Sequence, residues 1–128
     1  MSYYFSKILH IPFSEAILKV KAQLRQQGFG VLTEVNVAEV MEKKLDVDFR
    51  SYTILGACEP SSAYKALEAE DKIGTMLPCN VIVQQKEQDS VEIAAVDPVA
   101  SMQSISNPLL KDIAEQVRSK LKTVIDSL

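Results

Sequence analysis

The most reactive side chains of the sequence belong to its two cysteines, Cys58 and Cys79. Cys58 comes just before Pro60, which suits the first position of a helix because the missing N–H costs nothing there. Backbone N–H groups at such a helix start would favour a thiolate, and Cys79 could resolve an oxidised Cys58 if the Cα atoms lie within about 7 Å. The alternative, which we favour, is that both are small buried hydrophobic side chains, because their spacing matches no redox or zinc motif.

A second candidate group consists of Glu34, Arg50 and Tyr52. Glu34 lies among apolar neighbours in a predicted strand, on the same face as Leu32, and a carboxyl on a half-buried sheet face can act as a general acid or base. Arg50 and Tyr52 belong to the next predicted strand and could reach it. The alternative, again the one we favour, is that Glu34 lies at a solvated strand end or pairs with Arg50.

The strand that begins at Tyr52 offers a place for a ligand. Because side chains alternate along a strand, Tyr52, Ile54, Gly56 and Cys58 share one face. The gap left by Gly56 could form the floor of a small apolar pocket beside the helix that starts at Pro60. The alternative, which we favour, is plain core packing, in which Gly56 only permits a close approach of the helix. The predicted pocket comprises these residues: Glu34, Arg50, Tyr52, Cys58 and Cys79.

The sequence predicts neither a metal site nor a cofactor. His10 is the only histidine, and one histidine among scattered carboxylates lacks the spacing of a metal site. Asp97 and Asn107 each precede a proline, and we interpret both as helix N-caps. Hydrolase chemistry is not expected, because no serine or cysteine has the setting of a nucleophile elbow.

The composition is typical of a globular protein. Of 128 residues, 47% are hydrophobic and 24% are charged, so we expect one folded domain over residues 1–128. The formal net charge of −3 argues against a broad nucleic-acid-binding surface. No apolar run approaches the ~20 residues that span a bilayer, and the N-terminus lacks the pattern of a signal peptide. We therefore expect a cytoplasmic protein with free thiols and with neither nucleic acid nor a membrane as its partner.

Hydrophobic periodicity predicts strands that alternate with helices, followed by a closing hairpin. The expected strands cover residues 3–11, 29–35, 52–57, 77–83 and 91–96. The expected helices begin near residues 14, 37, 60 and 108. The last helix carries an apolar seam that should pack on the sheet. The order β-α-β-α-β-α-β-β-α predicts the α+β class, with a single, mostly antiparallel sheet of about five strands and helices packed on it.

Four segments of the chain resemble one known family. They read GFGVLTEVNV at 28–37, VDFRSYTILGACEP at 47–60, LPCNVIV at 77–83 and AVDP at 95–98. In this order and spacing they are similar to the family catalogued as domain of unknown function 302, over essentially the whole chain. The resemblance implies a small dimeric α+β protein with a TATA-binding-protein-like fold, and it implies no established activity. The chain departs from the family at Glu59, where members commonly have asparagine, a better helix cap.

Three functions from different classes remain open. The first, which we favour, is a small-molecule-binding or interaction module that forms a homodimer. The second is a thiol-dependent redox protein that uses Cys58 and Cys79. The third is a structural subunit without a ligand. A reactive thiol at neutral pH would point to the second, and a melting temperature that rises with ligand would point to the first.

Overall fold

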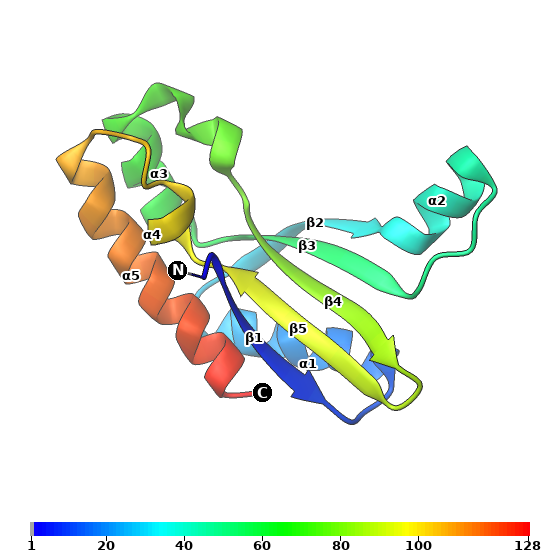
Figure 1. Ribbon diagram of the computed structural model, residues 1–128. Coiled ribbons are helices and arrows are strands. Elements are labelled where there is room, and N and C mark those ends of the chain that lie inside the picture. The colour runs from blue at the N-terminus through cyan, green and yellow to red at the C-terminus, as the bar shows by residue number, and fades with distance from the viewer. Residues whose placement is uncertain (1) are drawn as a thin grey trace.

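The chain folds around one antiparallel sheet of five strands, in the order β1-β5-β4-β3-β2 (Figure 1). The computed structural model describes residues 2–128. All neighbouring strands run antiparallel to each other. The strands are β1 (Tyr4–Leu9), β2 (Gly30–Asn36), β3 (Tyr52–Cys58), β4 (Cys79–Glu87) and β5 (Ser90–Val96). The predicted α+β class and the single, mostly antiparallel sheet of about five strands are confirmed.

Helices fill the connections between the strands. They are α1 (Phe13–Gln26), α2 (Val37–Leu45), α3 (Pro60–Ala69), the 3-10 helix η1 (Asp71–Met76), α4 (Pro98–Ser101) and α5 (Pro108–Asp126). The longer elements follow the predicted order β-α-β-α-β-α-β-β-α. Only η1 has no counterpart in the prediction, because six residues are too short to show a hydrophobic period.

Cap residues determine where most of the helices begin. α3, α4 and α5 each start with a proline, and the side chain of the residue before it accepts hydrogen bonds from backbone N–H groups of the first turn. These capping residues are Glu59, Asp97 and Asn107. Asn36 caps α2 in the same way. The predicted caps Asp97 and Asn107 are confirmed.

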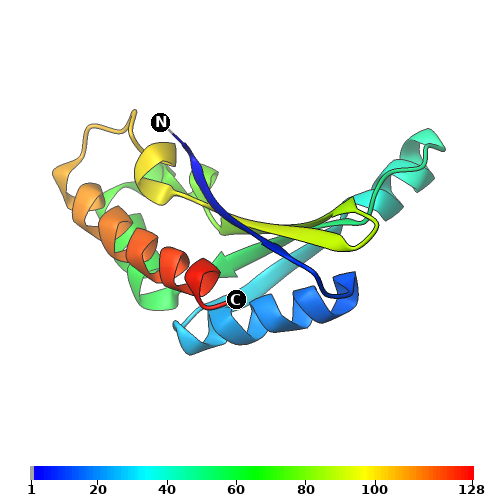
Figure 2. The same ribbon diagram turned by 60° about the horizontal axis from the view of Figure 1, so that its bottom comes forward.

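The main core lies between one face of the sheet and helices α1 and α5 (Figure 2). The apolar seam of α5 is buried, so its predicted packing on the sheet is confirmed. The buried residues of the seam and of the end of the helix are these: Leu110, Ala114, Val117, Leu121, Val124 and Ile125. Alternate residues of the central strands, such as Leu55, Val81 and Ile93, are fully buried opposite these helices. A smaller cluster around Ala66, Ile73 and Leu110 joins α3 and η1 to α5.

α2 stands apart from this core. β2 and β3 are antiparallel neighbours, yet residues 37–51 connect them where a short turn would be sufficient. Because the chain must return to the adjacent strand, α2 does not cross the sheet and instead extends beyond the strand ends (Figure 1). None of its residues is buried. We call residues 37–51 the arm.

The second face of the sheet carries no helix within residues 2–128 (Figure 2). The strand register places side chains from all five strands on this surface, which we call the open face. Its apolar members are Tyr4, Ile8, Val35, Tyr52, Ile54, Ile82, Ala94 and Val96. Across the same residues, no helix combines the length and the apolar composition needed to cross a bilayer.

Candidate functional site

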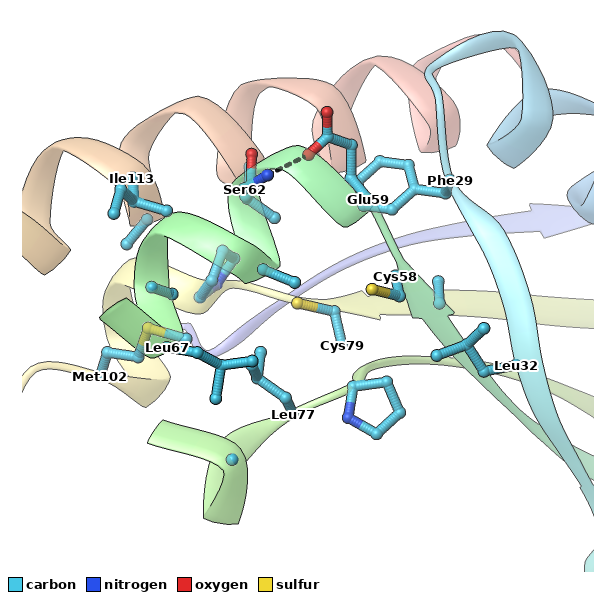
Figure 3. A pocket seen from close by; sticks show the side chains of 18 residues that line it. Phe29, Leu32, Cys58, Glu59, Ser62, Leu67, Leu77, Cys79, Met102 and Ile113 are labelled. Carbon is cyan, nitrogen blue, oxygen red and sulfur yellow. Dashed lines mark hydrogen bonds between the residues drawn. The ribbon is translucent and has the colours of Figure 1, made fainter. Parts of the chain in front are cut away.

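A pocket of about 300 Å³ lies where α3, η1 and α5 meet the ends of β2, β3 and β4 (Figure 3). Phe29 and Leu32 line it from the side of β2, and Ile113 lines it from α5. Most of the lining side chains contain only carbon or carbon and sulfur. The rest of the apolar wall comes from these residues: Ala57, Ala63, Ala66, Leu67, Leu77, Pro78, Pro98, Met102, Ala114 and Val117.

Small residues leave the space that the pocket occupies. Ala63 and Ala66 turn toward the cavity from α3, and Gly74 of η1 lines it as well. Larger side chains at these positions would fill the gap between α3 and α5. Leu67, which is 46% exposed, lines the same cavity from the last part of α3. The interior of the cavity is therefore apolar, and solvent reaches it past the exposed side chain of Leu67.

Both cysteines lie in the wall of this pocket. Cys58 ends β3, and Cys79 begins β4 opposite Ala57, so the two cysteines are diagonal neighbours in adjacent strands. Their sulfur atoms point the same way, into the pocket (Figure 3). Both thiols are free; Cys79 is buried, with 7% of its surface exposed, and Cys58 is half-buried. The structure thus brings together the two residues that carry the most reactive groups.

The two thiols are held in the protonated form. Burial, followed by repulsion from the Glu59 carboxylate, raises the pKa of Cys58. Burial, followed by the neighbouring Cys58, raises the pKa of Cys79 to about 11. Because burial and the capping carboxylate both raise the pKa of Cys58, they oppose a thiolate there and favour the alternative of two buried hydrophobic side chains.

The polar side of the pocket is provided by Glu59 and Ser62. The Glu59 carboxylate accepts a hydrogen bond of 2.5 Å from the backbone N–H of Ser62 and lies 3.4 Å from Nζ of Lys120 on α5. Burial would raise the pKa of Glu59, but the bonds with Ser62 and Lys120 dominate and the net pKa is lowered. Glu59 therefore caps α3 effectively, where the sequence predicted a weak cap, because its longer side chain reaches the N–H and a lysine neutralises it.

Gly56 does not line the pocket, and its surroundings fit the core-packing interpretation that we favour from the sequence. A Cβ atom at this position would collide with Oγ1 of Thr33 and would lie 2.7 Å from Cγ of Pro78. Thr33 belongs to β2, and Pro78 immediately precedes β4. Side chains from both neighbouring strands therefore fill the gap. The glycine therefore serves close packing within the sheet, which is the alternative interpretation, and the pocket lies beyond the end of β3.

Glu34 lies away from the pocket, on the face covered by helices. A β-bulge between Val31 and Thr33 inserts Leu32 as an extra residue, so Val31 pairs with Ala57 and Glu34 pairs with Leu55. The bulge therefore interrupts the predicted alternation between Val31 and Thr33, which oppose the adjacent residues Ala57 and Gly56. Its carboxylate pairs with Nζ of Lys21 on α1 at 2.6 Å, so the partner is Lys21 and not Arg50.

Arg50 and Tyr52 lie at the far end of β3 from the cysteines. Tyr52 begins the strand that Cys58 ends, which separates them by about 20 Å. The Arg50 guanidinium stacks on the rings of Phe49 and Tyr52, and its Nε donates a hydrogen bond of 2.9 Å to Gln84. Of the five predicted site residues, the structure brings together Cys58 and Cys79 and places the other three elsewhere.

Most of the pocket wall was not identified from the sequence. Leu67, Leu77, Met102 and Ile113 belong to four different segments and meet only in the folded chain. A sequence signal that could have pointed to this wall is the pair of small residues, Ala63 and Ala66, on the inner side of a short helix. In residues 2–128 no three or more His, Cys, Asp or Glu side chains gather closely enough to hold a metal ion.

The fold and the pocket define a small α+β protein with an apolar cavity between its sheet and its helices. The chain belongs to the family described as domain of unknown function DUF302, whose model matches residues 5–128. It is similar to a solved protein from Bacillus stearothermophilus, described as an uncharacterized conserved protein DUF302, with 28% identity and a TM-score of 0.90. That similarity covers 98% of each chain. Among curated proteins, none matches the chain.

Proposed function

We propose that this chain is a binding module whose pocket holds a small apolar molecule against Cys58 and Cys79. The pocket itself carries the proposal. Its volume of about 300 Å³ lies at the lower end of the range of about 300–1,000 Å³ for ligand sites, and ligand sites are typically apolar with a few placed polar groups. Glu59 and Ser62 are such groups, and they lie on one side of the cavity.

The chemistry of the wall limits what the pocket can hold. Apolar surface removed from water contributes about 25 cal/mol per Å², so a neutral, compact hydrocarbon or aromatic molecule gains the most. A free anion would have to be desolvated next to the Glu59 carboxylate, which is unfavourable. Protonated thiols and a methionine sulfur add polarisable contacts without adding charge. The pocket therefore favours a neutral, apolar ligand.

Binding of N-phenyl-1-naphthylamine, a neutral dye that fluoresces in apolar surroundings, tests this proposal. Ala63→Phe should fill the cavity and weaken dye binding at least tenfold. Ser61→Phe is the matched control, since Ser61 lies on the same helix, is exposed and does not line the pocket. Equal binding by both variants, or no saturable binding by the native protein, would contradict the proposal.

A thiol-dependent redox function is the second candidate. One observation favours it: the thiols of Cys58 and Cys79 open side by side into the same pocket (Figure 3). Their raised pKa values oppose it, because the thiolate is the reactive form and little of it exists at neutral pH. The structure therefore supports the binding module better than the redox protein.

We also propose that the protein acts in the cytoplasm as a homodimer, with neither nucleic acid nor a membrane as its partner. Two free cysteines are consistent with a reducing compartment. The net charge of −3 is unsuited to a broad contact with nucleic acid. Self-association is supported by the arm and the open face, both of which expose apolar side chains such as Leu45 and Ile8. Sedimentation of the purified protein tests the dimer directly.

A further inference from the structure

The arm exposes an apolar surface that the chain itself leaves uncovered. Val40, Leu45, Val47 and Phe49 are 41%, 65%, 44% and 38% exposed. α2 has nine residues and buries none of them. Helices of this length are marginal in water unless an apolar face packs against something. One cap at Asn36 and one ion pair between Glu39 and Lys43 contribute too little to replace that packing.

The open face complements the arm: within residues 2–128, the arm has a helix that buries none of its residues, and the open face is an apolar surface that no helix covers. Tyr4 and Ile8 are 42% and 45% exposed, and Ile54 and Ile82 lie half-buried at the centre. A shallow hollow of about 370 Å³ runs along this face and includes Tyr52. The charged side chains beside it, Arg50 and Glu92, are linked through Gln84, at 2.9 and 2.8 Å. The face is therefore apolar and close to neutral, so no net charge opposes the approach of a helix.

We propose that the arm of one copy packs across the open face of a second copy in a two-fold symmetric dimer. This inference rests on the homodimer proposed above and names its interface. In a two-fold contact each copy gives one arm and receives one, so a single interface covers both apolar surfaces. A separate partner would have to supply both a helix for the face and a cover for the arm. A second copy of this chain already carries both.

The dimensions of the two surfaces match. Nine residues of helix extend over about 14 Å. Five strands spaced about 4.8 Å apart make a face about 19 Å wide, so the helix fits across it. The arm and the alternate residues of the five strands together approach the ~20–30 residues per side of a stable interface. Tyr4, Phe49 and Tyr52 supply the aromatic side chains that typically anchor such contacts.

Sedimentation velocity of Leu45→Glu and Ile82→Lys tests the interface. Leu45→Glu places a charge on the arm and Ile82→Lys places one on the open face, and each should weaken the dimer at least tenfold. Leu109→Glu on α5 is the matched control, because Leu109 is 66% exposed and Leu45 is 65% exposed, and it should leave the dimer unchanged. Circular dichroism of each variant verifies that the fold is retained.

Mixing the two variants gives a second, independent test. A mixed dimer keeps one contact between a native arm and a native face, and its other contact joins a glutamate to a lysine. Mixing should therefore restore dimers, which native mass spectrometry identifies by mass. A native protein that sediments as a monomer would overturn both the homodimer and this interface. A native dimer that survives Leu45→Glu, or that mixing fails to restore, would overturn the interface alone.

Discussion

Single residues decide what the pocket can do chemically. Cys58 and Cys79 form part of its wall, yet burial keeps both protonated, so they act as apolar and polarisable surface at neutral pH. Glu59 remains ionised, because the backbone N–H of Ser62 donates a hydrogen bond to its carboxylate and Lys120 pairs with its charge. The single carboxylate near the pocket is therefore occupied by capping α3 and is not available as a general base.

Thiol reactivity follows from these protonation states. We expect Cys79 to be unreactive toward Ellman's reagent between pH 5 and 9 in the native protein, because its pKa is raised to about 11. Cys58 should react slowly below pH 9, since burial and Glu59 raise its pKa as well. Both should react at ordinary rates after unfolding in guanidinium. Cys58→Ser isolates the signal of Cys79, and a native thiol that titrates well below the ~8.5 of free cysteine would support the redox function.

Gly56 is expected to be intolerant of a side chain. Gly56→Ala should lower the free energy of unfolding by about 1–3 kcal/mol, because the added methyl overlaps Thr33 and Pro78 in a packed sheet. Gly30→Ala is the control, since nothing lies within 4 Å of a Cβ atom built there. Urea unfolding of both variants measures the difference. Equal stabilities would show that the strands around Gly56 can move apart at no cost.

At the scale of secondary structure, the cap at the start of α3 makes the stability of the fold depend on pH. The pKa of Glu59 is lower in the folded chain than the ordinary value of 4.5, so its ionisation stabilises the fold above about pH 4.5. This stabilisation is lost as the pH falls through the lowered pKa of the folded state. Glu59→Gln should therefore reduce the loss of stability between pH 5 and 3, as measured by urea unfolding at each pH. An unchanged pH profile would mean that the carboxylate contributes nothing to the fold.

The elements could be predicted because their signals are local. Asp97 and Asn107 each precede a proline, and the apolar seam of α5 repeats at helical spacing, so caps and helices could be identified without tertiary information. The bulge at Leu32 could not be predicted from the sequence, because it depends on how β2 pairs with β3. That one extra residue shifts the pairing, so that Val31 and Thr33 oppose the adjacent residues Ala57 and Gly56 of β3.

The candidate site was predicted only in part, for a geometric reason. Residues near each other in the sequence, such as Tyr52 and Cys58, lie at opposite ends of the same extended strand. Phe29, Leu77 and Ile113 are distant in sequence, yet they surround one cavity. The two cysteines line the same cavity because β3 and β4 are adjacent and antiparallel, so the end of one strand meets the start of the next.

At the scale of the whole molecule, helices α3 and α5 lie at one end of the sheet and α2 of the arm extends from the other (Figure 1). The pocket lies among α3, η1 and α5, and the arm extends from the far ends of β2 and β3. The proposed ligand pocket and the proposed arm contact therefore lie on separate surfaces. A variant of the pocket, such as Ala63→Phe, should leave the oligomeric state unchanged, and a variant of the arm should leave the pocket intact.

The location of a bound apolar molecule tests the account most directly. We would record amide ¹H–¹⁵N spectra of the labelled native protein during titration with N-phenyl-1-naphthylamine. The account predicts that the largest shift changes fall on pocket residues, including Cys58, Ala63, Cys79 and Ile113. Changes concentrated on the open face near Ile82, or no saturable changes at all, would contradict a binding function for the pocket.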